Sequence, residues 1–551
     1  MYARTFSGTV HGIDGITVAV EVDLANGLPQ FDIVGLGGSA VKESRDRVRA
    51  ALRNGGFEFP MKRITVNLAP ADLRKEGSAF DLAIALGILL SSEQLPLRNE
   101  RTMILGELAL DGSLRPIPGV LPILLEAKKQ GFTHALLPAG NAQEARLVEL
   151  QVMPAHNLKE AVSYWKPAKE NKDNGIDDCS DFTTNTPPTI HITNQPDPDA
   201  QYHPRADDLQ PSSSAPFQPP HHSKYNFSDV IGQTFVKRGL EVAAAGFHNV
   251  LLVGPPGSGK TLLANCLPTI MPQMTRDESF EVTKIYSIAG YLTHRSGLIQ
   301  ERPIRSPHHT ITSAALAGGG AQIPRPGECS LAHGGILFLD EIPEFSRHVI
   351  EVLRQPLEAG QITIGRAKQG YVFPAQFLLV GSMNPCPCGF YGTRAQQECT
   401  CSPQQIHRYR SRISGPILDR IDIHLEVPRV AVDLLGERQV EESSESIRER
   451  VERARLMQAE RFQGRKGFCY NSGMTGSDLR KYVPIDRDGQ ELMKLAFEKM
   501  GLSARGYDRI IKVARTIADL QGTEQVESTH VAEAIRYRAL DRGGVNGTYS
   551  Y

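Results

Sequence analysis

The chain has 551 residues, of which 40% are hydrophobic and 22% charged, and its formal net charge at pH 7 is −1. Three or four globular domains fit this length. A nearly neutral chain does not attract nucleic acid as a whole, so any DNA contact must come from local basic patches or from assembly into a ring. The longest apolar run, residues 82–90, is too short to span a bilayer, and the first residues lack the apolar core of a secretion signal. We therefore expect a cytoplasmic protein with no membrane association.

Residues 1–165 alternate short apolar runs with helical patterns, which is typical of an α/β domain. After residue 165 the composition shifts to Asp, Asn, Pro, Ser and His, and the apolar periodicity disappears. Residues 166–224 are therefore predicted to form a disordered or extended linker. The elements expected before the linker include strands at 16–22, 31–34 and 63–68, a helix over 39–54 that ends at Gly55-Gly56, and a buried helix over 82–90.

Two segments of this N-terminal part resemble the Lon protease domain. Residues 75–81 lie where that family has its serine nucleophile, and residues 106–119 lie where it has its lysine. Matched residue by residue, the serine position falls on Ala79 and the lysine position on Leu121, and neither side chain can act as a nucleophile or a base. The resemblance implies a Lon-protease-like fold without the catalytic dyad. The alternative is residual protease activity from Ser78, one residue away, which has no evident lysine partner.

An apolar run at residues 250–253 is followed by eight residues that fit the P-loop pattern. The glycines let backbone N–H groups surround phosphate oxygens, where a Cβ would obstruct. Lys260 can then reach the β- and γ-phosphates of ATP, and the hydroxyl of Thr261 can ligate Mg²⁺. Strand, loop and helix occur in the required order, which disfavours a chance match. The residues of the loop are Gly254, Pro255, Pro256, Gly257, Ser258, Gly259, Lys260 and Thr261.

A second buried strand, predicted at residues 335–339, ends in two carboxylates. Asp340 can hold Mg²⁺ through water, and Glu341 can take a proton from the attacking water. A third buried strand, at 377–381, leads to Asn384, at the place where a sensor-1 amide orients that water. These residues predict a site that binds ATP with Mg²⁺ and hydrolyses it. The residues at the place where AAA+ proteins contact adenine are Ile231, Gly232 and Gln233.

Arg420 follows a short apolar segment, at the position where MCM helicases and magnesium-chelatase ATPases carry a finger arginine. Such an arginine reaches into the nucleotide site of the neighbouring subunit, where it can be worth ~10³–10⁵ in rate. The alternative is a surface Arg–Asp pair.

The last part of the chain has the pattern of a helical AAA+ lid. Arg505 is its candidate sensor-2 residue, and a plain surface arginine is the alternative. A capping box of Ser446 and Glu449 is expected to open the first helix. The helices are predicted at 446–462, 490–500, 503–520 and 528–537.

Over residues 361–373, two segments with the alternating pattern of strands flank a polar turn that is bounded by glycines. This pattern predicts a hairpin. Arg366 and Lys368 lie at its tip. Helicases of the clade that includes MCM helicases and magnesium-chelatase ATPases use the corresponding hairpin to hold the DNA backbone in the pore of the ring. The alternative is a tip that contacts only solvent. Residues 302–309, inside the long insertion after the P-loop, are a second candidate pore element.

Four of the eight cysteines are clustered. They form two Cys-x-Cys turns separated by ten residues, and four thiolates on two tight turns can form a tetrahedral Zn²⁺ site. Because the more common spacing is Cys-x2-Cys, reduced surface cysteines remain the alternative. The four residues are Cys386, Cys388, Cys399 and Cys401.

The whole chain except the linker resembles the ComM/YifB family of magnesium-chelatase-like AAA+ ATPases. The resemblance rests on residues 35–44, on residues 305–309, on the P-loop and on residues 384–389. It implies a ring-forming, hexameric homo-oligomer that acts as an ATP-driven motor on single-stranded or branched DNA, in the integration of incoming DNA during natural transformation. The alternative is a magnesium-chelatase-type ATPase that remodels a protein partner.

The sequence thus predicts an α/β multidomain protein. The expected parts are a Lon-protease-like α/β domain without the dyad at 1–165, a linker at 166–224, an AAA+ P-loop core at 225–435 and a C-terminal helical lid at 436–551.

Overall fold

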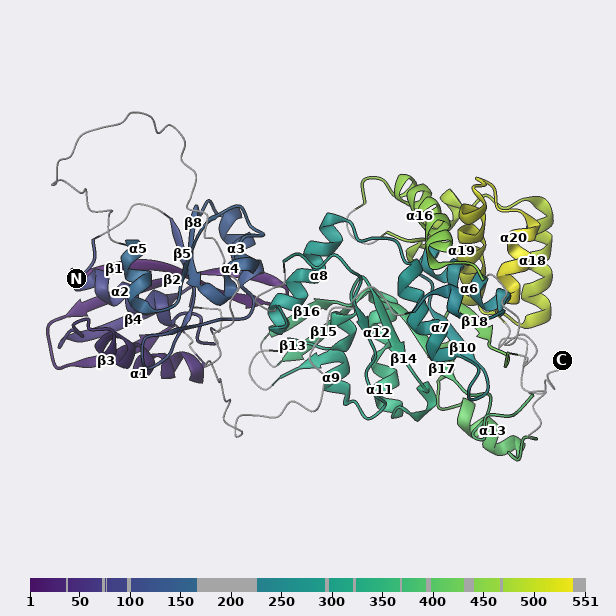
Figure 1. The fold of residues 1–551 in the computed structure, drawn as a ribbon, viewed down its shortest axis with the longest axis horizontal. Helices are drawn as coiled ribbons and strands as arrows, with labels where there is room; N and C mark the ends of the chain where they lie inside the picture. Colours follow the sequence, from purple (N-terminus) through teal and green to yellow (C-terminus); the bar gives the residue numbers. More distant parts are fainter. Residues whose placement is uncertain are drawn as a thin grey trace.

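The computed structural model describes residues 1–35, 38–71, 75, 77–96, 101–165, 225–292, 297–320, 324–366, 369–392, 398–430, 441–465 and 469–538. These residues form three parts arranged in a row along the long axis of the molecule: an α/β part, a parallel-sheet core and a helical part (Figure 1). The predicted α/β multidomain class is confirmed. The predicted linker lies outside the described residues. Within the described ranges, no helix is both long and apolar enough to cross a membrane.

The N-terminal part is built on a mixed seven-stranded sheet in the order β3-β4-β2-β1-β5-β8-β9. Strands β1 and β2 form a long antiparallel hairpin whose turn contains Gly12 at a φ of +61°. The predicted helix over 39–54 is confirmed, whereas the sequence analysis missed strand β1. The sheet strands are β1 (Tyr2–His11), β2 (Asp14–Ala25), β3 (Gln30–Val34), β4 (Arg63–Ala69), β5 (Thr102–Ile104), β8 (His134–Pro138) and β9 (Gln151–Ala155), with a small ribbon of β6 (Glu107–Leu108) and β7 (Leu114–Arg115).

Helix α2 is the centre of this part, because all eleven of its residues are buried. It packs against β1 and β2, and Gly87 permits the close approach, since a Cβ there would lie 2.6 Å from Cγ2 of Val22. An apolar run without amphipathic periodicity is typical of such a buried helix. The helices of this part are α1 (Ser39–Asn54), α2 (Asp81–Ser91), α3 (Val120–Lys129), α4 (Ala142–Ala145) and α5 (Leu158–Trp165).

The core is an all-parallel five-stranded sheet in the order β11-β14-β17-β10-β18. Its three central strands are completely apolar or small and buried on both faces, as expected for a parallel sheet. The carboxyl ends of parallel strands meet at one edge, so the segments that follow β10, β14 and β17 lie together. The strands are β11 (Ile304–Arg305), β14 (Ile336–Leu339), β17 (Leu378–Met383), β10 (Val250–Val253) and β18 (Ile423–Glu426).

Helices and two small ribbons complete the core. The predicted hairpin is confirmed as a two-stranded ribbon of β15 and β16. The elements are α6 (Thr234–Gly246), α7 (Lys260–Cys266), α8 (Arg276–Ala289), α9 (Ser313–Ala317), α10 (Glu328–Leu331), α11 (Arg347–Val352), α12 (Arg354–Ala359), α13 (Pro403–Arg410), α14 (Gly415–Leu418), β12 (Gly318–Gly319), β13 (Arg325–Pro326), β15 (Gln361–Arg366) and β16 (Gln369–Pro374).

The helical part packs against α6 of the core through α16 and α19. The predicted capping box at Ser446 is wrong: Ser443 is the N-cap of α16 and accepts a hydrogen bond from the backbone N–H of Ser446. A serine stands at both positions, and local pattern alone did not separate them. The helices are α16 (Ser444–Arg461), α17 (Gly476–Tyr482), α18 (Arg487–Met500), α19 (Ala504–Gln521) and α20 (Ser528–Arg536).

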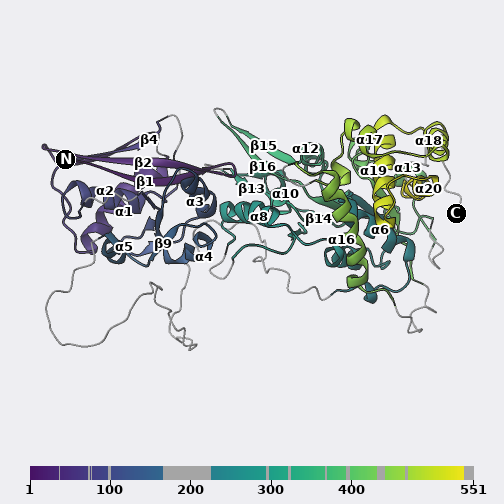
Figure 2. The same ribbon diagram turned by 90° about the horizontal axis from the view of Figure 1, so that it is seen from above.

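Two contacts between described side chains illustrate how the N-terminal part packs on the core. Between α4 and α8, the hydroxyl of Ser287 donates a hydrogen bond to the buried carboxylate of Glu144. Between the β1–β2 hairpin and β16, the ring of His11 lies against that of Tyr371 with their centroids 4.5 Å apart. Figure 2 shows β1 and β2 extending toward the core at the level of β16. The N-terminal part is therefore packed against the β16 strand of the β15–β16 hairpin, at Tyr371, which pairs with Ile364.

Candidate functional site

The P-loop lies between β10 and α7, where the sequence predicted it. Gly257 and Gly259 have φ values of +74° and +87°, a region that favours glycine, and the space into which a side chain would project is open at both. Lys260 is folded back on the loop: its Nζ donates to the carbonyl oxygens of Gly254 at 2.8 Å and Pro255 at 2.9 Å. Burial lowers the pKa of Lys260, and the carboxylates of Asp340 and Glu341 oppose that effect. The loop thus presents an ammonium group above an open glycine turn.

Four further predicted site residues converge on the same edge of the sheet. The Nζ of Lys260 lies 3.2 Å from Oδ1 of Asn384, beyond the end of β17. The hydroxyl of Thr261 donates to Oδ2 of Asp340 at 3.1 Å, beyond the end of β14. Glu341 follows with a φ of +53°, which is uncommon for a residue with a side chain and is found most often at functional sites. The structure therefore brings five predicted side chains to one place.

Ser382 connects two of these groups and was missed by the sequence analysis. Its hydroxyl donates to the carboxylate of Asp340 and accepts from the backbone N–H of Glu341 at 3.0 Å. Ser382 is completely buried on β17, two residues before Asn384. A serine inside an apolar strand, close to a candidate site residue, is the signal that could have indicated it.

The oxygen atoms at this edge fit a magnesium ion. Asp340 and Thr261 offer a carboxylate and a hydroxyl 3.1 Å apart beside the open glycine turn. Mg²⁺ prefers one or two carboxylates, with phosphates and water completing its shell. These two residues would hold the ion, and it would neutralise phosphate charge there.

The segment predicted to contact adenine packs on the P-loop. Gln233 has a φ of +51°, and its Nε2 donates to the carbonyl oxygens of Ser258 at 3.0 Å and Pro428 at 3.2 Å. The backbone N–H of Gly232 donates to Glu441, at the entry to the helical part, at 2.6 Å. Gly232 and Gln233, which follow the half-buried Ile231, thus join the P-loop, the end of β18 and the helical part.

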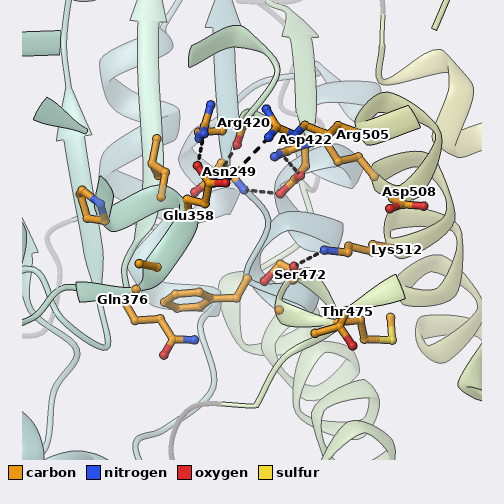
Figure 3. Close-up of a pocket in the computed structure, with 18 of the residues that line it drawn as sticks. Asn249, Glu358, Gln376, Arg420, Asp422, Ser472, Thr475, Arg505, Asp508 and Lys512 are labelled. Atoms are coloured by element: carbon orange, nitrogen blue, oxygen red, sulfur yellow. Dashed lines mark hydrogen bonds and ion pairs between the residues drawn. The ribbon is translucent and has the colours of Figure 1, made fainter. Parts of the chain in front are cut away.

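Arg420 and Arg505 lie together, but in a different place. They line a cleft of about 480 Å³ between the core and the helical part, and none of the P-loop residues lines it (Figure 3). Nη1 of Arg420 donates to the carbonyl oxygen of Pro416 at 2.7 Å, and Nη2 donates to the carboxylate of Glu358. Nη2 of Arg505 lies 3.8 Å from the other oxygen of Glu358. The two arginines therefore share one carboxylate.

The segment that carries Arg420 is tied to both sides of the cleft. The side chain of Asn249, before β10, donates to the carbonyl oxygen of Arg420 at 3.0 Å. Asp422 accepts from Arg509 of α19 at 2.6 Å and lies 3.4 Å from the ring of His248. Burial would raise the pKa of Asp422, but Arg509 and His248 hold it well below its usual value. Because Arg420 and Asp422 are 8% and 5% exposed, the interpretation as a surface Arg–Asp pair is wrong.

The four clustered cysteines come together after β17. Their sulfur atoms all lie within 4.8 Å of one another. Burial opposes ionisation, but the backbone N–H of Phe390 and neighbouring thiols lower the pKa of Cys388 to about 6, whereas burial raises that of Cys399 to about 12. Four sulfur donors at this separation fit a tetrahedral Zn²⁺ site. Zinc itself stays a prediction.

The cysteine loop lies against the P-loop. A Cβ on Gly389, which has a φ of +87°, would lie 2.5 Å from Cδ of Pro256. Only glycine fits this approach, so the turn after Cys388 packs on the loop that is predicted to hold the phosphates.

The tip of the predicted DNA hairpin lies outside the described residues. Strands β15 and β16 are described, but the side chains of Arg366 and Lys368 lie outside the described residues. In the second candidate pore element, Arg302 is 7% exposed and donates to Glu278 and to backbone carbonyls, while Arg305 pairs with Glu328. These two arginines are bound within the subunit, which disagrees with a role in a pore.

The two positions that match the Lon dyad are apolar neighbours. Ala79 and Leu121 belong to the same hydrophobic cluster. The hydroxyl of Ser78 donates a hydrogen bond to the carboxylate of Glu107, and the backbone N–H of Leu121 donates to Glu144 at 2.8 Å. The hydrogen-bond partner of Ser78 is therefore a carboxylate and not a lysine.

Comparison with known proteins identifies the family. Residues 226–435 match the family model described as magnesium chelatase, subunit ChlI, residues 20–141 match subunit ChlI of Mg-chelatase, and residues 441–538 match the ChlI C-terminal model. Competence protein ComM of Haemophilus influenzae is 41% identical over 98% of this chain and 98% of its own length. The protein YifB of Salmonella typhimurium is 39% identical over 96% of each chain. The magnesium-chelatase 38 kDa subunit of Rhodobacter capsulatus is 26% identical over 40% of this chain and 62% of its own.

The similarity to ComM and YifB extends over nearly the full chain. The chain belongs to the ComM/YifB family of magnesium-chelatase-like AAA+ proteins.

Proposed function

We propose that this protein is a ring-forming, ATP-driven DNA motor that moves branched DNA during the integration of incoming DNA in natural transformation. One observation carries the proposal. Lys260, Asp340, Glu341 and Asn384 meet at one edge of the sheet, whereas Arg420 and Arg505 line a cleft that contains no P-loop residue. A nucleotide site divided in this way is completed when a second subunit brings its cleft to the P-loop of the first.

Each group at the P-loop edge has a place in hydrolysis. Lys260 gives up its bonds to the loop carbonyls and takes the β- and γ-phosphates of ATP. Glu341 takes the proton of the attacking water, which the amide of Asn384 orients. The hydroxyl of Thr261 and the carboxylate of Asp340, held by Ser382, carry the magnesium ion that neutralises phosphate charge. Gln233 and its neighbours hold the adenine end.

Arg420 and Arg505 act on the ATP of the neighbouring subunit. Both guanidinium groups face the same cleft, and Arg509 and Lys512 add positive charge to its lining. A guanidinium group that meets the γ-phosphate stabilises the charge that develops during transfer. Closure of such contacts around a ring fits a cyclic homo-oligomer, for which we propose a hexamer.

DNA passes along the β15–β16 hairpin, with Arg366 and Lys368 as backbone contacts. The N-terminal part, a Lon-like domain without the dyad at 1–165, packs on strand β16 of this hairpin through His11 and Tyr371. It serves assembly or DNA contact rather than proteolysis. The other domain boundaries we propose are a linker at 166–224, a core at 225–435 and a lid at 436–551.

The cysteine cluster holds one zinc ion, which fixes the loop that packs on the P-loop. Elemental analysis of the purified protein should give close to one zinc per chain, and Cys388→Ser should lose it. A metal-free preparation with full ATPase activity would contradict this site.

A magnesium-chelatase-type ATPase that remodels a protein partner is the second candidate. It is favoured by the family models, all three of which are described as magnesium chelatase. Its ATPase would respond to a protein and not to DNA.

The test is the ATPase rate of the full chain, measured alone, with single-stranded DNA and with a four-way junction. A DNA motor should hydrolyse ATP faster with DNA and move the junction only when ATP is present. ATPase activity that is indifferent to DNA, with no movement of the junction, would overturn the motor and leave the second candidate.

A further inference from the structure

We propose that Glu358 is a positioning residue that restrains Arg420 and Arg505. Its carboxylate binds both guanidinium groups in place of a phosphate of the neighbouring subunit, and it must release them for hydrolysis. The proposal rests on the divided nucleotide site described above and names a residue that no sequence motif indicates.

The first argument is the geometry around the carboxylate. One oxygen of Glu358 accepts from Nη2 of Arg420, and the other lies 3.8 Å from Nη2 of Arg505 (Figure 3). Hydrogen bonding and attraction to Arg420 lower the pKa of Glu358, so the group is ionised. A single anion between two convergent guanidinium groups is the arrangement that arginines make around a phosphate. Glu358 thus occupies an anion position.

The second argument is competition for hydrogen-bond donors. Nη1 of Arg420 is bound to Pro416 and Nη2 to Glu358. A guanidinium group has five N–H donors in a fixed plane, so an end that is directed at Glu358 is not directed at another anion. The backbone of Arg420 is held by Asn249, which leaves the side chain as the part that moves. Contact with a neighbour's γ-phosphate therefore requires Arg420 to exchange one anion for another.

The third argument is the position of Glu358 in the chain. It lies in the last turn of α12, two residues before Gly360, which caps the helix with a φ of +65°. Strand β15 begins immediately afterward, and the backbone N–H of Ala375, just past the end of β16, donates to the carbonyl oxygen of Gly360 at 2.8 Å. Both strands of the hairpin are thus anchored within a few residues of Glu358. Displacement of the hairpin by DNA would displace the carboxylate and free the arginines.

The inference predicts the behaviour of Glu358→Gln, which keeps the shape of the side chain and removes its charge. Without the competing charge, Arg420 and Arg505 turn to the neighbouring phosphate in the absence of DNA. The DNA-free kcat/KM for ATP should rise by about threefold to tenfold, and stimulation by DNA should shrink accordingly. Glu351→Gln is the matched control, because Glu351 pairs with Arg354 on the adjoining turn, and it should leave both quantities unchanged.

A second variant separates positioning from folding. In the double variant with Arg420→Ala, the gain caused by Glu358→Gln should vanish, since the carboxylate acts through that arginine. If Glu358→Gln does not give folded protein, Glu358→Asp is measured instead. The shorter side chain withdraws the carboxylate from the arginines and should raise the DNA-free rate in the same direction.

The outcomes are distinct. A DNA-free kcat/KM that is unchanged or lower in the Glu358 variant, or a gain that persists without Arg420, would overturn the role of Glu358. If DNA does not stimulate the wild-type ATPase, the DNA motor fails, yet a raised rate in Glu358→Gln that depends on Arg420 still supports the positioning role.

Discussion

The P-loop edge and the Arg420 cleft both contain cationic side chains, but the two places differ in the groups that surround those side chains. At the edge, one ammonium group lies on backbone carbonyls beside an open glycine turn and two carboxylates. In the cleft, two guanidinium groups converge on the single carboxylate of Glu358. The edge offers a place for a phosphate and a metal ion, whereas the cleft offers arginines. This difference is what we expect if the edge and the cleft are two halves of one site contributed by different subunits, as proposed above.

The largest expected effect comes from separating the halves. Arg420→Ala should lower ATP hydrolysis by about 10³-fold while sparing ATP binding, because a finger arginine stabilises charge only during transfer. Lys260→Ala removes the other half. When the two inactive variants are mixed, some interfaces pair an intact Lys260 with an intact Arg420, so part of the activity should return.

The control for the mixture is subunit exchange, followed with two fluorescent labels. A mixture no more active than either variant alone, under conditions in which the labels exchange, would contradict a divided site.

The next effect tests the P-loop edge alone. Glu341→Gln should bind ATP but turn it over at least ~10²-fold more slowly, through loss of the general base. Binding is measured by equilibrium titration with a fluorescent nucleotide and turnover by phosphate release. Glu344→Gln, three residues further along and paired with the exposed Arg412, is the control. Turnover equal to wild type in the first variant would remove Glu341 from the mechanism.

The two halves also differ in how far the sequence predicts them. The P-loop and its strand are contiguous, so Lys260 and Thr261 could be assigned roles from spacing alone. The strand ends that carry Asp340 and Asn384 follow from the rule that parallel strands place their carboxyl ends together. At this edge the predicted residues do lie together, although Ser382, which connects Asp340 and Glu341, was missed.

In the cleft the residues were predicted but their surroundings were not. Arg420 was found by resemblance, yet its partner Glu358 stands 62 positions away and Asp422 meets Arg509 across 87. The first contact depends on how distant segments of the core pack and the second on how the helical part docks, and local patterns encode neither. The predicted start of α16 was wrong for a more local reason, because Ser443 and Ser446 are similar candidates for the N-cap.

The third expected effect concerns the connection between the cleft and the helical part. Asp422→Asn leaves Arg509 without its buried, charged partner. The substitution should lower the free energy of unfolding at pH 7 by about 3 kcal/mol. The folded pKa of Asp422 lies below its unfolded value of about 3.9, so its contribution is complete above that pH and is lost as the pH falls toward the folded pKa.

Urea midpoints measured by circular dichroism check this. The gap between wild type and Asp422→Asn should be wide at pH 7 and should shrink progressively as the pH falls below about 4. Asp488→Asn, at an exposed position of α18, should show no gap at either pH. A gap that is independent of pH would show that Asp422 stabilises the fold by shape rather than by charge.

The smallest expected effect lies outside both halves, at the hairpin tip. Lys368 is predicted to contact a DNA phosphate, and a phosphate contact carries no base information. Lys368→Ala should therefore keep the DNA-free ATPase rate, weaken DNA binding by a few-fold for every sequence, and lower the salt dependence of binding by about one unit of slope. Stimulation by DNA and movement of a four-way junction should fall together, because both depend on the same contact. Lys494→Ala, at an exposed position of α18, is the control for the loss of one positive charge. A Lys368→Ala protein that moves junctions at the wild-type rate would remove the hairpin from the DNA path, while the divided ATP site tested with Arg420 and Lys260 would stand.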